Sequence, residues 1–211
     1  MLFFDYLSKV DLNETDHLPL LPTGRTLSSE ALKSMSNPKE SAVGIHCYLN
    51  NENNHEFLLI ERSEYNGKHS GQIAFPGGKK EASDIDLLAT ARRECHEEIG
   101  IKITDGILIR ELSPVYIPVS NFRMVPFVFY HQAKPILTLN KREVKDVIPL
   151  TLEDLSFALS ITLRNIPVDK NSLFIRDVPG FEHGTYWIWG ATALVLSQLK
   201  STFIAWKKES R

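Results

Sequence analysis

Residues 71–101 read GQIAFPGGKKEASDIDLLATARRECHEEIGI and carry the strongest structural pattern in the sequence. It opens with a short apolar run, turns at a Pro-Gly-Gly triplet, and then carries apolar residues at steps of three and four. That spacing predicts a helix over 84–99 with Ser83 as its N-cap, because side chains three or four apart share one helix face. The apolar stripe consists of Leu88, Ala91, Cys95 and Ile99.

Three glutamates, Glu94, Glu97 and Glu98, fall within an arc of roughly 100° on this helix. On a helix alone they would indicate a solvated acidic face. Here Arg93 lies one turn before Glu97, and the Gly-Gly pair lets backbone carbonyls approach without a Cβ in the way. Carboxylates held this close repel one another unless a cation joins them, and hard oxygen ligands suit Mg²⁺ or Mn²⁺. The stretch therefore predicts a divalent-metal site.

Strands surround this stretch, because apolar, β-branched runs alternate with turn residues. The predicted strands cover 42–49, 56–61, 72–75, 107–115, 123–131 and 144–149. The first two flank an Asn-rich turn and should form a hairpin. Further helices are predicted over 189–206 and 154–163. Strands interleaved with few helices indicate a mixed α/β or α+β domain.

A polar-leaning leader precedes the strands, over residues 1–40. Its apolar residues near 3–7 fit one face of a short helix, and 28–33 resembles a capped second helix. The leader is either a packed extension of the main domain, a lid over the site, or an arm in a homodimer.

Composition excludes several classes of protein. The 211 residues contain 24 Lys+Arg against 26 Asp+Glu, a net charge of -2, so they lack the positive charge that nucleic acid or an anionic membrane would require. No apolar run approaches the ~18 residues of a membrane span. Two cysteines outside any CxxC pair and an apolar start too brief for a signal peptide predict a cytoplasmic, reducing location.

The stretch resembles the Nudix box, the signature of hydrolases that cleave nucleoside diphosphates linked to another group. The family pattern ends Arg-Glu-(apolar)-x-Glu-Glu-x-Gly-(apolar), which RECHEEIGI at 93–101 matches completely. Asp84 replaces the usual Glu, and the loop is one residue longer. The resemblance implies a Nudix-type α/β/α sandwich with a mixed central sheet, in a hydrolase domain over 41–211.

The longer loop is similar to that of one branch, the coenzyme A pyrophosphatases. LLIERS at 58–63 and HSGQIAFPGG at 69–78 resemble the additional motif of that branch, with Ile60 for Thr and Asn66-Gly67 for a Leu-Arg pair. YWIWGATA at 186–193 resembles its C-terminal element. This resemblance implies metal-dependent hydrolysis of the pyrophosphate of coenzyme A or acyl-CoA, giving 3′,5′-ADP and (acyl-)4′-phosphopantetheine.

The resemblance also implies roles for single residues. The metal ligands would be Gly77 (through its carbonyl), Glu94, Glu97 and Glu98. Arg93 would hold a helix glutamate in place, and the general base stays open between a helix carboxylate such as Glu97 and the later-loop Glu143. The substrate phosphates would be contacted by Arg62, His69 and Gln72, with a loop-holding role as an equal alternative for His69.

Three competing interpretations remain at this point. The first is another Nudix specificity, for ADP-ribose, a dinucleotide or a modified nucleoside triphosphate. The second is a Nudix-fold binding module without catalysis, which would be expected to lack helix glutamates that are all present here. The third treats the acidic helix as an interface.

Overall fold

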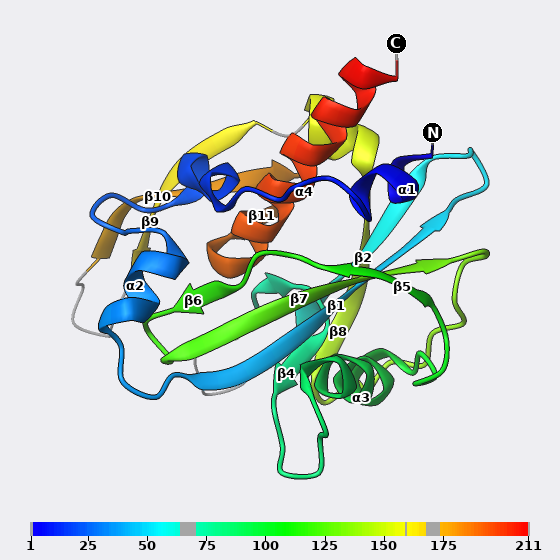
Figure 1. The fold of residues 1–211 in the computed structure, drawn as a ribbon, viewed down its shortest axis with the longest axis horizontal. Coiled ribbons are helices and arrows are strands. Elements are labelled where there is room, and N and C mark those ends of the chain that lie inside the picture. The colour runs from blue at the N-terminus through cyan, green and yellow to red at the C-terminus, as the bar shows by residue number, and fades with distance from the viewer. Residues whose placement is uncertain (1, 64–70, 159, 168–173, 211) are drawn as a thin grey trace.

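The computed structural model of the chain describes residues 2–63, 71–158, 160–167 and 174–210, and Figure 1 shows their arrangement. The structure contains a main sheet and a separate, smaller sheet. Helices lie on both faces of the main sheet (Figure 1). In chain order the elements are α1 (Phe3–Leu7), η1 (Glu14–Leu20), α2 (Ser28–Ser34), β1 (Lys39–Leu49), β2 (His55–Arg62), β3 (Ile73–Ala74), β4 (Gly77–Lys79), α3 (Leu87–Ile99), β5 (Ile107–Glu111), β6 (Val115–Ile117), β7 (Phe122–His131), β8 (Val144–Thr151), η2 (Asp154–Ala158), β9 (Ile161–Pro167), β10 (Phe174–His183), β11 (Tyr186–Trp189) and α4 (Gly190–Glu209).

The main sheet is mixed, because β1 pairs in parallel with β7 while its other ladders are antiparallel. Its strand order is β3-β2-β1-β7-β5, and β4, β6 and β8 pair with β1, β7 and β2. The register Cys47↔Phe57 and Tyr48↔Glu56 confirms the predicted hairpin of β1 and β2. A mixed sheet between helical layers confirms the α/β fold class, the α/β/α sandwich with a mixed central sheet.

The central strand β1 is buried on both faces, and its side chains alternate between two cores. Val43, Ile45 and Cys47 pack in the core on the α4 face. Ala42 and Tyr48 belong to the smaller clusters on the α3 face. This alternation follows from the period of two in a strand, and it fixes which side of the sheet α3 can cover.

Helix α3 confirms the predicted helix but begins three residues later. Ser83 is not its cap, which corrects the prediction: Asp86 is the N-cap, and its side chain accepts a 2.7 Å hydrogen bond from the Ala89 N–H. An aspartate three residues before Ala89 satisfies a free N–H of the first turn, which a serine placed farther back cannot reach. Gly100 ends the helix in the left-handed conformation, at φ 75°.

The leader packs against α4 on the opposite face of the sheet (Figure 1). Phe3 is fully buried, and its ring centroid lies 5.3 Å from that of Phe203 on α4. The Tyr6 hydroxyl donates to a carboxylate oxygen of Glu209 at 3.0 Å. Arg110 of β5 donates to the carbonyl of Leu7, the last residue of α1, and to that of Val10 just after the helix.

Two segments differ from the predictions. The predicted helix over 154–163 is wrong beyond Ala158: one short helical turn is followed by β9, whose backbone pairs with β10. The predicted strand over 107–115 is divided into β5 and β6, because Pro114 has no N–H for a ladder and the Ser113 N–H donates to Gln198 on α4 instead.

No helix in the described part of the chain combines the length and apolar character needed to cross a membrane. Cys47 and Cys95 are both free and buried.

Candidate functional site

The site is built around a buried carboxylate, that of Glu98 on the last turn of α3. Its side chain is 1% exposed and accepts a 2.8 Å hydrogen bond from the Gly77 N–H at the start of β4. Arg62, at the end of β2, donates to its other oxygen at 3.2 Å. Burial raises the pKa of Glu98 to about 7, although the Arg62 charge and the Gly77 N–H both favour the ionised form. Glu98 therefore joins the helix, the glycine turn and β2 at one point.

Arg93 gathers the remaining helix carboxylates. Its Nη1 lies 2.9 Å from an oxygen of Glu94 and 3.0 Å from an oxygen of Glu97, one turn farther along α3. Glu94 is half-buried and Glu97 exposed, and burial raises the pKa of Glu94. The predicted pair between Arg93 and Glu97 is present, and the same guanidinium also holds Glu94.

Asp84 holds Arg93 from the opposite side. Its carboxylate receives Arg93 Nε and Nη2 at 2.9 Å each, and also the Thr90 hydroxyl and the Glu81 N–H. These hydrogen bonds, those from Arg93 foremost, hold the pKa of Asp84 well below its usual range. The departure from the family pattern at Asp84 thus coincides with the anchor of the arginine that gathers the carboxylates.

Gly78 in β4 lets Glu94 approach the backbone. A Cβ at this position would lie 2.5 Å from the carboxyl carbon of Glu94. Such a separation is shorter than any van der Waals contact of these atoms, so only glycine is compatible with this position of Glu94. Gly78 pairs with Ala42 on β1, and this pairing holds β4, the strand that Glu94 faces, in place.

Glu143 reaches the site from the loop before β8. Its carboxylate accepts a 2.8 Å hydrogen bond from the Asn140 side chain, and its carbonyl accepts one from the Ser63 N–H. Behind the dominant effect of burial, the charge of Glu143 also contributes to the raised pKa values of Glu94 and Glu98. The structure thus places the Glu143 carboxylate on Asn140, whose backbone N–H is bonded to the Glu98 carbonyl at the end of α3.

The donor set can be compared with what a divalent cation requires. Among the described residues, no group of three or more His, Cys, Asp or Glu side chains is arranged so that it could hold a metal ion as it stands. Arg93 and Arg62 provide the positive charge between the carboxylates instead. The donors themselves are oxygens on one side of α3, with a buried carboxylate among them, and hard divalent cations prefer such ligands. The set fits Mg²⁺ or Mn²⁺ in chemical kind.

The three predicted substrate contacts have different outcomes. Arg62 lies at the site, with its side chain 23% exposed, and its Nε has no hydrogen-bond partner within the described ranges. Gln72 lies opposite Arg62, and its carbonyl accepts the Arg62 N–H at 3.0 Å. His69 lies outside the described residues, as does Asn66-Gly67.

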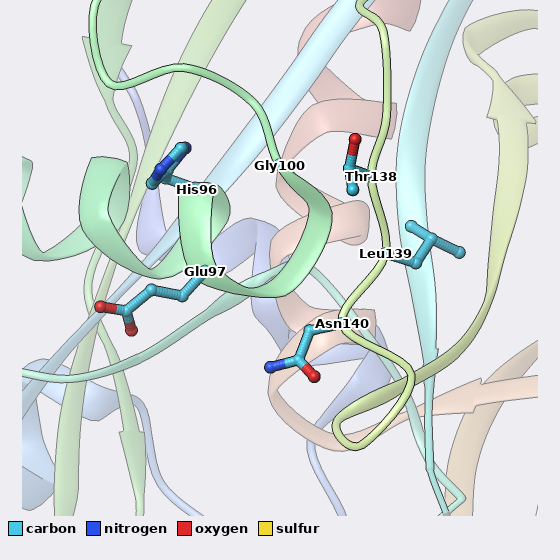
Figure 2. A pocket seen from close by; sticks show the side chains of 6 residues that line it. All are labelled: His96, Glu97, Gly100, Thr138, Leu139 and Asn140. Atoms are coloured by element: carbon cyan, nitrogen blue, oxygen red, sulfur yellow. The ribbon is translucent and has the colours of Figure 1, made fainter.

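A hollow of about 410 Å³ lies beside the C-terminal end of α3 (Figure 2). Its lining residues are His96, Glu97, Gly100, Thr138, Leu139 and Asn140. Figure 2 shows the loop with Thr138 and Asn140 running past the end of the helix. The buried Cys95 thiol, whose pKa is raised by burial, packs in the core between α3 and the sheet and does not reach this surface.

Sequence reasoning missed two residues of this site, Asp84 as an anchor and Asn140. A signal for Asn140 was available in the sequence, because an Asn two residues before Arg142 can accept its N–H and form a local turn. No comparable signal pairs Asp84 with Arg93, since the loop between them has no regular period.

Comparisons with known proteins show the family and the fold. The family model described as NUDIX domain matches residues 40–169. The chain is 32% identical over 149 residues to an uncharacterized Nudix hydrolase, NudL, of Pectobacterium atrosepticum, covering 67% of this chain and 72% of the relative. It is 29% identical over 143 residues to NudL of Yersinia pestis, covering 67% and 69%. In fold, it is similar to the crystal structure of a MutT/nudix family protein from Enterococcus faecalis, with a TM-score of 0.54, 14% identity, and coverage of 91% of this chain and 73% of that one.

Proposed function

The chain belongs to the NUDIX family and is a Nudix hydrolase, and from this premise we propose that it cleaves the pyrophosphate of coenzyme A or an acyl-CoA. The products would be 3′,5′-ADP and 4′-phosphopantetheine or its acyl form. We further propose that residues 41–211 form the hydrolase domain, that residues 1–40 extend it, and that the protein is cytoplasmic.

One observation carries the choice of substrate. The segments that resemble the coenzyme A branch, 58–63 and 69–78, supply both groups that bind Glu98, namely Arg62 and the Gly77 N–H. The specificity motif and the Nudix helix are therefore joined at one carboxylate. A motif that serves substrate choice is expected next to the reacting phosphates, and this contact supports that placement.

Nudix hydrolases generally use divalent metal ions, and we propose Mg²⁺ or Mn²⁺ here. Glu94, Glu97, Glu98 and the Gly77 carbonyl would hold the metal. When bound, a divalent cation neutralises charge on phosphoryl oxygens and lowers the pKa of a water molecule.

Proton transfer, positioning of the carboxylates and binding of the phosphates would be carried out by the protein's own side chains. Glu97 or Glu143 would accept the proton of the attacking water, since Glu97 belongs to the helix cluster and the Glu143 carboxylate is held by Asn140 at the end of α3. Arg93, fixed by Asp84, would keep Glu94 and Glu97 in place. Arg62, His69 and Gln72 would bind phosphate oxygens. For Arg62 this is supported by its unpartnered Nε, a donor without a hydrogen-bond acceptor among the described residues.

The test compares substrates and variants in one assay. Coenzyme A, acetyl-CoA, ADP-ribose and a diadenosine polyphosphate are incubated with the wild type and Mg²⁺ or Mn²⁺, and products are resolved by chromatography. The matched variants are Glu98→Gln and Glu182→Gln, the second removing an arginine-paired glutamate on the small sheet.

We expect release of 3′,5′-ADP by the wild type and by Glu182→Gln, and a loss of at least about 100-fold in Glu98→Gln, because a metal ligand is removed. Cleavage of ADP-ribose or the dinucleotide faster than coenzyme A would discard the proposed substrate and keep the chemistry. Equal activity of Glu98→Gln and the wild type would exclude the proposed metal-binding role of Glu98 on α3.

A further inference from the structure

The loop between β7 and β8 is attached to the C-terminal end of α3. The Thr138 N–H donates to the Ile99 carbonyl and the Asn140 N–H to the Glu98 carbonyl, both at 2.9 Å. The last carbonyls of a helix have no partner within the helix, and this loop satisfies two of them. Asn140 is thus bonded through its backbone to the residue that carries the buried carboxylate, and Figure 2 shows it on the loop that runs past the last turn of the helix.

The side chain of Asn140 uses both ends of its amide. Its Oδ1 accepts the Arg142 N–H at 3.2 Å, which closes a tight local turn. Its Nδ2 donates to an oxygen of Glu143 at 2.8 Å. Its carbonyl also accepts the N–H groups of Glu143 and Val144. A single residue therefore determines both the path of the loop and the direction of the Glu143 carboxylate.

The loop is also held from β2. Ser63, next to Arg62, donates its N–H to the Glu143 carbonyl at 2.8 Å and its hydroxyl to the Lys141 carbonyl at 3.1 Å. These bonds fix the backbone of Glu143 but not its carboxylate. Among the described residues, the hydrogen bond that reaches the carboxylate is the one from Asn140. Orientation of the carboxylate thus depends on the Asn140 amide.

We propose that Asn140 is a positioning residue of the hydrolysis reaction, which acts by holding the Glu143 carboxylate beside the C-terminal end of α3, the helix that carries Glu94 and Glu98. The inference rests on the proposed function, in which Glu143 is a candidate general base. In this proposal Asn140 acts through Glu143 and does not itself bind substrate or metal. Its hydrogen bonds connect the backbone of α3 at Glu98 to the Glu143 carboxylate on the loop before β8.

The decisive variant is Asn140→Asp, which keeps the oxygen that accepts the Arg142 N–H and replaces the donor with a second oxygen. The matched control is Asn50→Asp. Asn50 forms the same kind of turn in the β1–β2 hairpin, accepting the N–H groups of Glu52 and Asn54 and donating to Glu56 at 3.3 Å. Glu143→Gln and the double variant Asn140→Asp/Glu143→Gln complete the set. All are assayed on the substrate that the wild type cleaves fastest.

We expect kcat of Asn140→Asp to fall about 10- to 100-fold, as for outer partners that orient functional groups, with KM within about 2-fold of the wild type. Asn50→Asp should keep the wild-type kcat, and the two variants should melt at similar temperatures. In the Glu143→Gln background, the additional Asn140→Asp change should have no further effect on kcat, because the carboxylate it orients is gone.

Equal kcat in Asn140→Asp and Asn50→Asp, or a full additional loss in the double variant, would overturn the role of Asn140 while the proposed function stands. If the wild type cleaves none of the substrates, the proposed function fails first. Crystal structures of the wild type and Asn140→Asp then decide the inference: the Glu143 carboxylate should turn away from α3, and an unchanged position would overturn it.

Discussion

Arg93 and Asp84 face each other as a planar fork, with Nε 2.9 Å from Oδ1 and Nη2 2.9 Å from Oδ2. The remaining guanidinium nitrogen is directed to Glu94 and Glu97. An arginine held by two parallel bonds has lost most of its freedom before it binds anything else. The positions of the Glu94 and Glu97 carboxylates therefore depend on Asp84, which lies in the loop before the helix.

The substitution Asp84→Asn should disturb the site more than the fold. The amide would keep one acceptor but offer Arg93 no charge, so we expect activity to fall about 10- to 100-fold. Asp86→Asn is the matched control, because an asparagine caps a helix as well as an aspartate does and Asp86 does not contact Arg93. Steady-state kinetics on both variants check this, and equal losses would contradict the anchoring role.

Gly78→Ala should displace Glu94. The new Cβ would lie 2.5 Å from the carboxyl carbon of that residue, and a misplacement of about 1 Å costs roughly 100-fold in rate. The double variant Gly78→Ala/Glu94→Asp shortens the displaced side chain, so it should regain any melting temperature lost in Gly78→Ala without regaining activity. Thermal unfolding and turnover measured together test this, and a fully active Gly78→Ala protein would refute it.

The stability of the metal-free protein should depend on pH through Glu98. Its pKa is about 7 in the folded protein against an ordinary 4.5, so the folded state retains a proton that the unfolded chain releases. The stabilising contribution of this retained proton is present below pH 4.5 and is lost as pH rises through about 7. It amounts to about 3 kcal/mol in the free energy of unfolding. Glu98→Gln should lack this slope in urea unfolding at several pH values. Parallel wild-type and variant curves would exclude the effect.

The leader should contribute to stability and not to turnover. Phe3→Ala removes a fully buried ring, so we expect a loss of about 3–5 kcal/mol in the free energy of unfolding. Leu2→Ala is its neighbouring control, because Leu2 is 71% exposed. Urea unfolding measures both, and kcat of the folded Phe3→Ala protein should match the wild type. A lower kcat with unchanged stability would instead indicate a lid.

The sequence predicts the parts of the molecule that depend on local pattern. Leu88, Ala91, Cys95 and Ile99 recur with the helical period, so the helix and the shared side of its glutamates follow directly. The hairpin of β1 and β2 follows from its turn residues. The sequence places Gly77 and Glu98 at one site, as expected ligands of one metal, but it does not predict the hydrogen bond from the Gly77 N–H to Glu98 that the structure shows.

Contacts between distant segments were not predictable in this way. The fork of Asp84 and Arg93 depends on the path of an irregular loop, and the bond of Asn140 to the end of α3 depends on how β7 and β8 are joined. The helix predicted over 154–163 extends wrongly into the first residues of β9, because a short apolar run fits either period and pairing with β10 decides the outcome. The roles of the site residues remain predictions.

The packing of the leader on α4 determines when one part of the core can form during synthesis of the protein. Phe3 and Phe203 share one aromatic contact, although they lie far apart along the chain, one on α1 and the other on α4. During translation the leader and the sheet emerge before α4, so Phe3 lacks its contact with Phe203 while the sheet is being made, although His55 of β2 and Tyr130 of β7 are already available to the leader. Such transiently exposed apolar segments invite chaperone binding, and closure of this core becomes a late, post-translational event.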